Sequence, residues 1–453
     1  MSEVAPAIEL RGIDKSFGTV RANRGVSLSV AKGSITGIVG ENGAGKSTLM
    51  SILYGLYEAD AGEILVDGQP VRMRGPADAI AHGIGMVHQH FMLVAPFTVL
   101  ENLVLGAEGG PVLRRGLAAA RAELARLARE YGLSVDPDAV VADLSVGEQQ
   151  RVEILKVLFR GARVLILDEP SAVLTPQETD QLFRILATLK ERGVTVLLIT
   201  HKLREIMAAT DAVYVMRQGE IVAERRTADT SPDELAELMV GRKVRLTLDK
   251  DVAAPGAVLL KAEKIALTDA RGVKLLDGID LELRAGEIVG VAGVSGNGQT
   301  ELLQILAGVR APTGGRLSVR GRVIDIMNPT DPAEMRRLGL CHVPEDRIRQ
   351  GMVVPFRASE TSILGYHRLS PFTRRGLLDH GATTTHCGTL MERFDVRPPI
   401  PALRSGSFSG GNQQKLVLAR EMDRAPRILL VGQPTRGVDI GAIEFIHGRL
   451  RAM

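Results

Sequence analysis

The chain has few aromatic side chains, and its charges nearly cancel. It contains no Trp, and Phe, Trp and Tyr together make up 3% of its 453 residues. A surface on which nucleic-acid bases stack against aromatic rings is therefore not expected. Lys and Arg number 56 against 53 Asp and Glu, which gives a net charge of +3. Because this excess is too small to predict a polyanionic partner, we expect no nucleic-acid partner.

Cysteine and long apolar runs are also scarce. The two cysteines, Cys341 and Cys387, lack the paired spacing of a zinc site or a disulfide framework. Apolar runs such as "VLILDEP" and "VTVLLIT" have the length of strands, short of the ~18 residues that a membrane-spanning helix needs. The N-terminal stretch has no basic leader followed by an apolar core, so no signal peptide is expected. These features predict a soluble, cytosolic chain.

What the chain does contain is an internal repeat. The stretch "GIVGENGAGKSTLMSILYGL" is answered by "GVAGVSGNGQTELLQILAGV", with Gly40 opposite Gly293. Farther on, "LSVGEQQRVEILKVLFRGARVLILDEP" is answered by "FSGGNQQKLVLAREMDRAPRILLVGQP", with Ser145 opposite Ser409. Two copies in the same order indicate a duplicated domain. Strand-like runs alternate with helical patterns in each copy, which predicts an α/β fold with two tandem domains at residues 1–243 and 257–453, joined by a linker at 244–256.

The first copy has an intact phosphate-binding loop. The loop "GENGAGKST" follows an apolar strand, "SITGIVG", and opens a helix, "STLMSILYGL", which is the context that such a loop requires. Its glycines let backbone amides point at the phosphates, Lys46 adds a charge near the β and γ phosphates, and Ser47 offers a hydroxyl to Mg²⁺. The nucleotide-binding residues expected here are Gly40, Glu41, Asn42, Gly43, Ala44, Gly45, Lys46, Ser47 and Thr48.

Two adjacent carboxylates follow a later apolar strand. In "VLILDEP" the strand ends at Asp168 and Glu169. A carboxylate at the carboxyl end of a parallel strand can hold Mg²⁺ through water, and the next one can polarise an attacking water. Behind a phosphate loop, we interpret Asp168 as a metal ligand and Glu169 as a general base.

With "LSVGEQQRVEI" in front of "VLILDEP", the chain resembles the ATP-binding cassette (ABC) ATPases. The resemblance implies two tandem nucleotide-binding domains, each with a phosphate-loop core and a helical subdomain that carries the signature sequence. By the same resemblance, Gln89 in "GMVHQHF" is the glutamine that senses Mg²⁺ and the membrane partner, and it joins Ser47 and Asp168 as a metal ligand. His201 matches the histidine that contacts the γ-phosphate, and Phe17 in "KSFG" matches the aromatic residue that stacks on adenine. Thr175 stands where many relatives have an aspartate.

The second copy departs from the family at its catalytic positions. Gln299 replaces the lysine, Gly432 and Gln433 replace the carboxylates, and Glu345 replaces the metal-sensing glutamine. The equivalent of His201 would fall beyond Met453, so we expect an incomplete second domain that exposes apolar edges. Since a general base contributes about 10²- to 10⁴-fold, the second copy is not expected to hydrolyse ATP.

The second copy nevertheless keeps its signature. The residues expected to contact a nucleotide there are Ser409, Gly410, Gly411, Asn412 and Gln413. In the first copy Val146 and Glu148 depart from the pattern, and a β-branched residue cannot readily take a positive φ. ABC domains resemble one another in pairing head to tail, so that each nucleotide lies between one domain's phosphate loop and the other's signature. The sequence therefore predicts one competent ATP site, built from the first copy's loop and the second copy's signature.

The whole chain resembles the fused ATP-binding subunits of bacterial importers for ribose-type sugars and nucleosides. The stretches "HVPEDR" and "QPTRGVDIGAIEFIH" look most like the nucleoside branch. The resemblance implies two membrane permease subunits, an extracytoplasmic binding lipoprotein and a peripheral place on the cytoplasmic face of the inner membrane. The segment "HFMLVAPFTVLENL" is the expected docking place for a permease helix, or otherwise partly buried core. The alternative is a soluble tandem ABC ATPase that acts on ribosomes.

Overall fold

The computed structural model describes residues 5–18, 20–89, 91–106, 113–172, 174–243, 254–294 and 296–453. The chain divides into two compact units, Met1–Val244 and Arg245–Met453. Most of the expected linker, residues 244–253, lies outside the described part. No helix in the described ranges is long and apolar enough to cross a membrane.

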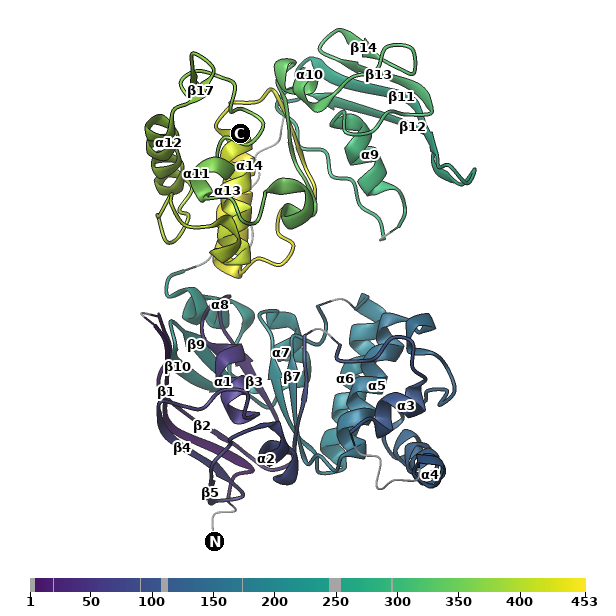
Figure 1. The fold of residues 1–453 in the computed structure, drawn as a ribbon, viewed down its shortest axis with the longest axis vertical. Helices are drawn as coiled ribbons and strands as arrows, with labels where there is room; N and C mark the ends of the chain where they lie inside the picture. The colour runs from purple at the N-terminus through teal and green to yellow at the C-terminus, as the bar shows by residue number, and fades with distance from the viewer. Residues whose placement is uncertain are drawn as a thin grey trace. The chain divides into compact units, whose positions relative to one another are not determined.

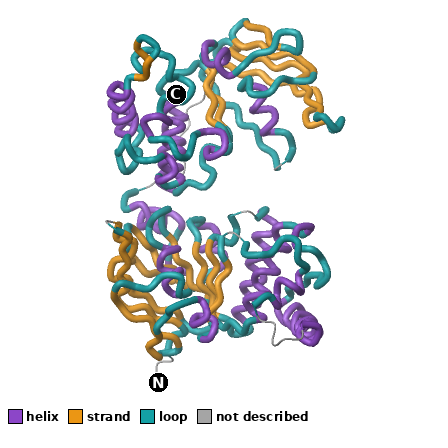
Figure 2. The backbone as a smooth tube through the Cα atoms, viewed as in Figure 1, coloured by secondary structure: helices purple, strands orange, loops and turns teal. Residues whose placement is uncertain are grey.

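Unit 1 contains an antiparallel sheet and a mostly parallel one (Figures 1 and 2). The four-stranded sheet has the order β2-β1-β4-β5, with β1 Ile8–Phe17, β2 Val20–Val30, β4 Ala61–Val66 and β5 Gln69–Val71. The six-stranded sheet has the order β10-β9-β3-β8-β7-β6 and is parallel except for the β10–β9 pair. Its strands are β3 Ile35–Val39, β6 Ile84–Val87, β7 Val164–Asp168, β8 Thr195–Ile199, β9 Ala212–Arg217 and β10 Glu220–Arg226.

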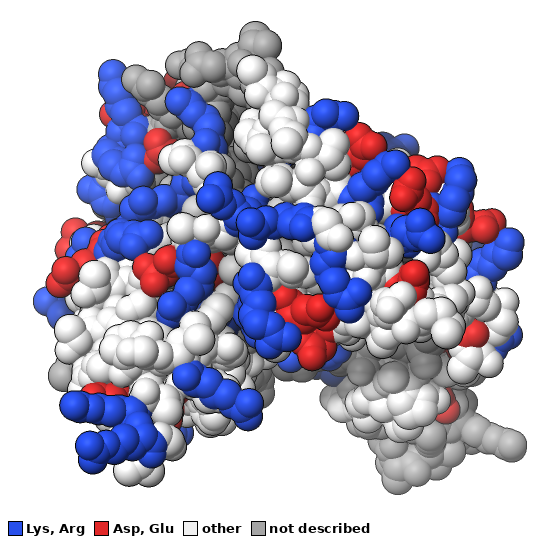
Figure 3. Space-filling view, turned by 90° about the horizontal axis from the view of Figure 1, so that it is seen from above, with Lys and Arg blue, Asp and Glu red and all other residues white. Residues whose placement is uncertain are grey.

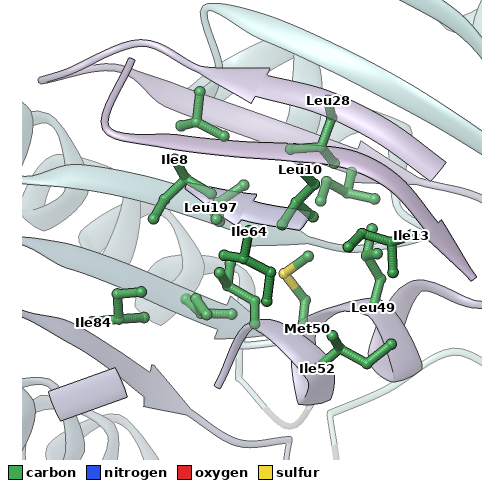
Figure 4. Close-up of a cluster of buried hydrophobic side chains, with 14 of the residues drawn as sticks. Ile8, Leu10, Ile13, Leu28, Leu49, Met50, Ile52, Ile64, Ile84 and Leu197 are labelled. Carbon is green, nitrogen blue, oxygen red and sulfur yellow. The ribbon is translucent and has the colours of Figure 1, made fainter. Parts of the chain in front are cut away.

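Every residue of β3, β7 and β8 is buried, because both faces of the parallel sheet are covered. The helices of unit 1 are α1 Lys46–Leu53, α2 Pro76–Ala81, α3 Val99–Val104, α4 Leu113–Tyr131, α5 Val146–Phe159, α6 Pro176–Glu191, α7 Leu203–Ala209 and α8 Pro232–Val240. One apolar core brings α1, the antiparallel sheet and the parallel strands together (Figure 4). A second core on the other face joins the sheet to α3, α4, α5 and α6. The loops at the carboxyl ends of the parallel strands are thereby fixed along one edge of the sheet.

Unit 2 repeats the antiparallel sheet but has a much smaller parallel one. Its first sheet has the order β12-β11-β13-β14, with β11 Val258–Thr268, β12 Lys274–Arg284, β13 Gly314–Val319 and β14 Arg322–Ile324. Strands β15 Leu340–Val343 and β18 Ile428–Val431 form a parallel pair, and β16 Thr373–Arg374 with β17 Leu377–Leu378 forms a small hairpin. The helices are α9 Gln299–Leu306, α10 Pro332–Arg337, α11 Ala358–Thr361, α12 His380–Arg393, α13 Gly410–Met422 and α14 Ile440–Ala452.

The stretch that matches β3 of unit 1 forms no strand in unit 2. Ile288, Val291 and Val294 are 65%, 57% and 70% exposed, and residues 287–294 pair with no strand of the described ranges. In unit 1, β3 lies between β8 and β9. The described part of unit 2 has no counterpart of those two strands, so this apolar stretch has no paired strand within it.

Charged side chains of both signs lie on the surface. On the face seen in Figure 3, Lys and Arg are interspersed with Asp and Glu. Many of them form exposed pairs, such as Lys264–Asp280 with a separation of 2.7 Å between Nζ and Oδ2. Pairs of this kind contribute about 0–1 kcal/mol each, so the fold depends on its buried cores and not on surface charge.

Candidate active site

The phosphate loop of unit 1 connects β3 to α1. All nine predicted loop residues lie between the end of β3 and the first turn of α1. Gly43 and Gly45 have φ of 86° and 100°, a region that residues with a Cβ rarely adopt. A Cβ on Gly45 would also lie 2.3 Å from the carbonyl oxygen of Ala22. The loop therefore requires glycine there, and the first amides of α1 form a ready anion site.

Lys46 is held inside this loop. The residue is only 5% exposed, and its Nζ donates to the carbonyl oxygens of Gly40 at 2.7 Å and Glu41 at 2.9 Å. The ammonium is thus fixed at the loop, where it can offset phosphate charge without a large rearrangement.

Ser47 and Asp168 face each other across the site. Asp168 is the last residue of β7, and the Ser47 Oγ donates to its Oδ1 at 3.5 Å. Burial raises the pKa of Asp168 above its ordinary value, and the Ser47 hydrogen bond opposes this shift. In the described ranges no three His, Cys, Asp or Glu side chains gather into a metal site. Mg²⁺ commonly takes one or two carboxylates plus phosphate oxygens, so this hydroxyl–carboxylate pair fits Mg²⁺ that arrives with a nucleotide.

Glu169 lies at the centre of a small hydrogen-bonded group. Its Oε1 is 3.0 Å from His201 Nδ1, and its Oε2 accepts from Gln89 Nε2 at 3.3 Å. Gln89 and His201 follow strands β6 and β8, which flank β7, so parallel pairing brings the three side chains to one edge. The His201 hydrogen bond is the main reason that the pKa of Glu169 lies below its ordinary value. The carboxylate is therefore ionised at neutral pH and can accept a proton.

Phe17, the expected adenine contact, ends β1 and is 44% exposed. Its ring meets Tyr57 edge to face, with centroids 5.2 Å apart, and Lys15 Nζ lies 5.6 Å from its centre. The partnership with Tyr57 was not predicted, because nothing in the sequence spacing connects a strand end to a residue beyond α1. Phe17 is thus an oriented, accessible aromatic ring.

In the signature of unit 1, the serine is bonded to a carboxylate of the same signature. Ser145 caps the N-terminus of α5, and its Oγ donates to Glu148 Oε2 at 2.8 Å while its backbone N–H donates to the same oxygen at 2.9 Å. These bonds hold the pKa of the Glu148 carboxyl below its ordinary value. An ionised carboxylate at the helix N-terminus occupies the place that an anion would need. The sequence contains the signal for this capping box in "SVGE", a Ser followed by Glu three residues later.

In the signature of unit 2, by comparison, the serine is bonded to an amide and not to a carboxylate. Ser409 directly precedes α13 without a side-chain bond to the helix backbone, and its Oγ accepts from Asn412 Nδ2 at 2.9 Å. A hydroxyl has one proton to donate, which this contact leaves available. The expected reason for the difference, a positive φ that Val146 could not adopt, is wrong: Val146 and Gly410 are both first helical residues, and Gly410 and Gly411 are absent from the left-handed region. What distinguishes the two signatures is instead the carboxylate of Glu148 in unit 1.

Thr175 also has a local role. It caps α6 through a reciprocal pair of bonds with Glu178. The matching residue of unit 2 is Asp439, which caps α14 by accepting from the Ala442 backbone N–H at 2.8 Å. The sequence analysis missed Asp439, although the offset between Ser145 and Ser409 locates it.

A family model described as "ABC transporter" matches residues 23–172 and 276–436, one segment for each copy of the repeat. The chain belongs to the ABC transporter family. It carries the ATP hydrolase activity of this family, coupled to transport. Membership of this family also accounts for the grouping of five predicted residues at one edge of the parallel sheet of unit 1: Lys46, Asp168, Glu169, Gln89 and His201.

Three curated ABC relatives match nearly the whole chain. The nucleoside import ATP-binding protein NupA of Lactococcus lactis is 46% identical over 443 residues, which are 98% of this chain and 87% of that protein. The glucose import ATP-binding protein TsgD13 of Haloferax volcanii is 45% identical over 472 residues, 98% of this chain and 85% of that protein. The guanosine import ATP-binding protein NupO of Bacillus subtilis is 45% identical over 443 residues, 98% of this chain and 86% of that protein. The resemblance to importer subunits is thereby confirmed.

Proposed function

We propose that this chain binds and hydrolyses ATP to energise a membrane importer of nucleosides or related pentose sugars. The observation that carries the proposal is the unit 1 site, where Glu169 is ionised and oriented by His201 and Gln89 beside an intact phosphate loop. Two of the three relatives above are named for nucleoside or guanosine import, which favours nucleosides over glucose. None is named for action on ribosomes, so nothing favours that alternative.

In the proposed reaction the loop residues 40–48 hold the phosphates, with Phe17 against the adenine ring. Ser47 and Asp168 would hold Mg²⁺, whose chemistry there would be to supply positive charge to the phosphates. Glu169 accepts a proton from the attacking water, and His201 and Gln89 keep its two oxygens in place. A general base of this kind contributes about 10²- to 10⁴-fold to the rate.

We further propose that only one ATP site is competent, and that the unit 1 loop forms it with the unit 2 signature. The local chemistry of each unit supports this pairing. Ser409 has a hydroxyl proton and glycine backbone amides to offer a phosphate, whereas Ser145 is bonded to the ionised Glu148. The Glu148 carboxylate and a nucleotide phosphate are both negative and would repel each other at the unit 1 signature. This repulsion would disfavour nucleotide binding there.

The proposed partners are two permease subunits and an extracytoplasmic binding lipoprotein, which would place the chain on the cytoplasmic face of the inner membrane. Of the proposed docking segment, residues 90–103, His90 lies outside the described residues. Met92 and Phe97 of this segment are 65% and 38% exposed. Met92 also lines a cavity of about 180 Å³, together with residues that include His88, Asn102 and Glu153. Exposed apolar side chains next to a hollow suit a docked helix.

The proposal is tested by reconstituting the chain with its permeases and binding protein in vesicles. ATP hydrolysis and uptake are measured against a panel of nucleosides, pentoses and glucose. We expect nucleosides to stimulate both, because the substrate acts through the permease on the ATP site. Stimulation by glucose alone, or by no sugar or nucleoside, would contradict the proposal.

A further inference from the structure

The loops that carry Glu169 and His201 begin where the pairing of β7 with β8 ends. The last paired residues are Asp168 and Ile199, and the Glu169 backbone N–H then donates once more to the Ile199 carbonyl at 2.9 Å. Glu169 has φ of 47°, in the left-handed region, so the chain turns away from the strand at this residue. The 3.0 Å separation between Glu169 Oε1 and His201 Nδ1 therefore depends on what holds the two loops together beyond the strands.

A single buried carboxylate connects these two loops. Glu205, on α7, is 4% exposed. Its Oε1 accepts from the Ser171 hydroxyl, and its Oε2 accepts from Thr200 Oγ1 at 2.9 Å. Ser171 lies two residues after Glu169, and Thr200 directly precedes His201. Each oxygen of one side chain therefore holds one of the two loops.

Lys202 completes this network. Its Nζ donates to the Ser171 carbonyl at 3.0 Å and to Ser171 Oγ at 2.9 Å, and it lies 3.3 Å from Glu205 Oε1. The Lys202 backbone N–H donates to Thr200 Oγ1 at 3.0 Å. Ser171 and Thr200 thus both accept from Lys202 and donate to Glu205. Because a hydroxyl has only one proton, this pattern fixes the direction of both side chains.

Glu205 is not placed to meet a nucleotide or an attacking water itself. Both of its oxygens accept from buried hydroxyls, since Ser171 is 2% exposed and Thr200 is 1% exposed. Any effect of Glu205 on ATP hydrolysis would therefore pass through the two loops that it connects.

We propose that Glu205 is a positioning residue of the ATPase, which holds the loops of Glu169 and His201 at the separation that the general base requires. Glu205 has this role only if Glu169 and His201 act as proposed above, so the inference rests on the proposed function. A displacement of about 1 Å at a reacting group can cost ~10²-fold in rate. Loss of the Glu205 bonds would let the loops separate, and His201 would no longer orient Glu169.

The test uses the full chain assembled with its permeases and measures kcat and KM for ATP hydrolysis, together with Tm. Glu205→Ala should lower kcat by about 10- to 100-fold and leave KM unchanged, because the base is misplaced while the phosphate loop still binds ATP. The Tm should also fall, since Ser171 and Thr200 lose a buried acceptor. A role in folding alone would lower the Tm and leave the kcat of the folded chain unchanged.

Glu205→Gln is the milder variant, chosen so that the chain folds. Glutamine keeps the volume of glutamate and one oxygen acceptor, but its NH₂ group cannot accept the second hydroxyl proton, so only one of the two loops keeps its bond. The kcat should fall by less than in Glu205→Ala, again at unchanged KM. Glu237→Gln, which removes an exposed carboxylate of α8, is the matched control and should change neither quantity.

A double-mutant cycle with His201→Ala shows whether Glu205 acts through the Glu169–His201 pair. Once His201 is removed there is no pair to position, so Glu205→Gln should lower kcat by less than it does in the parent chain. Fold-changes that simply multiply, or a Glu205→Gln chain with the parent's kcat, would overturn the positioning role even though Glu169→Gln still lowers hydrolysis. Hydrolysis that survives Glu169→Gln would instead contradict the proposed function, and with it the role of Glu205.

Discussion

At the scale of single residues, the central feature is one ionised carboxylate with two oriented partners. Glu169 is bonded to His201 through one oxygen and to Gln89 through the other, so its direction is fixed by the strands on either side of β7. The neighbouring Asp168 has the opposite character, because burial disfavours its charge. Adjacent carboxylates with pKa values moved apart suit different tasks, one as base and one as metal ligand.

Replacing the base tests the first of these tasks. Glu169→Gln should lower ATP hydrolysis by about 10²- to 10⁴-fold while ATP still binds, since the phosphate loop is untouched. Phosphate release and equilibrium ATP binding are the two measurements. Glu191→Gln, an exposed position at the end of α6, serves as the control and should leave both unchanged. Hydrolysis that survives Glu169→Gln would mean that another group activates water.

The buried Asp168 gives a prediction about stability. Because burial raises its pKa in the folded state, the folded chain holds the proton more tightly than the unfolded chain, and stability falls as pH rises through that range. Without Mg²⁺ and nucleotide at neutral pH, Asp168→Asn should therefore raise the Tm. The gain should shrink as pH is lowered toward the ordinary aspartate value. A Tm that falls on substitution at neutral pH would show that the ionised carboxylate stabilises the empty site.

At the scale of elements, α5 does more than carry a signature. Glu153 is almost fully buried, and its Oε1 accepts from the backbone N–H of Met92 at 2.6 Å. Lys156 Nζ donates to the carbonyl of Met92 at 2.9 Å and pairs with Glu153 at 2.9 Å. One turn of α5 thus binds both backbone groups of Met92, in the segment that connects Gln89 to the proposed docking surface.

Breaking this clamp should loosen the segment. Glu153→Ala removes the partner of Lys156 from a largely buried site, which costs about 3–5 kcal/mol for a pair of this kind. Denaturant unfolding should report that loss, and hydrogen exchange at Met92 and its neighbours should accelerate. Glu130→Ala, on the partly exposed surface of α4, is the control and should change neither quantity. Unchanged exchange at Met92 would show that the segment is held by other contacts.

The elements also show what the sequence could and could not predict. The order of motifs was enough for the fold class, the duplication and the grouping of the unit 1 residues, because glycines, a lysine and strand-end carboxylates recur at fixed points of such a fold; the roles of those residues remain predictions. Two features escaped because they depend on side chains meeting in space. The sequence contains the pattern for the Glu148 capping box, but it suggested backbone φ as the difference between the two signatures. The Glu345 side chain lies close to Gly432, and no sequence pattern predicts that contact. Tyr57 beside Phe17 is of the same kind.

At the scale of the whole molecule, duplication has produced two units with complementary losses. Unit 1 has the loop lysine and the proposed general base, and its signature serine is bonded to Glu148. Unit 2 has Gln299 and Gln433 at the positions of that lysine and base, and its signature serine accepts from Asn412. From these local differences we propose that the groups of unit 1 and the signature serine of unit 2 serve a single ATPase site.

The most direct test compares Ser409→Ala with Ser145→Ala in the full chain assembled with its permeases, by steady-state ATP hydrolysis and by Tm. Ser409→Ala should lower turnover by about 10²- to 10³-fold, as loss of one donor to a developing phosphate charge does, with little change in Tm because its hydroxyl caps no helix amide. Ser145→Ala should leave turnover unchanged, although loss of its cap costs about 1 kcal/mol of stability. If Ser145→Ala abolishes hydrolysis and Ser409→Ala does not, the claim is contradicted.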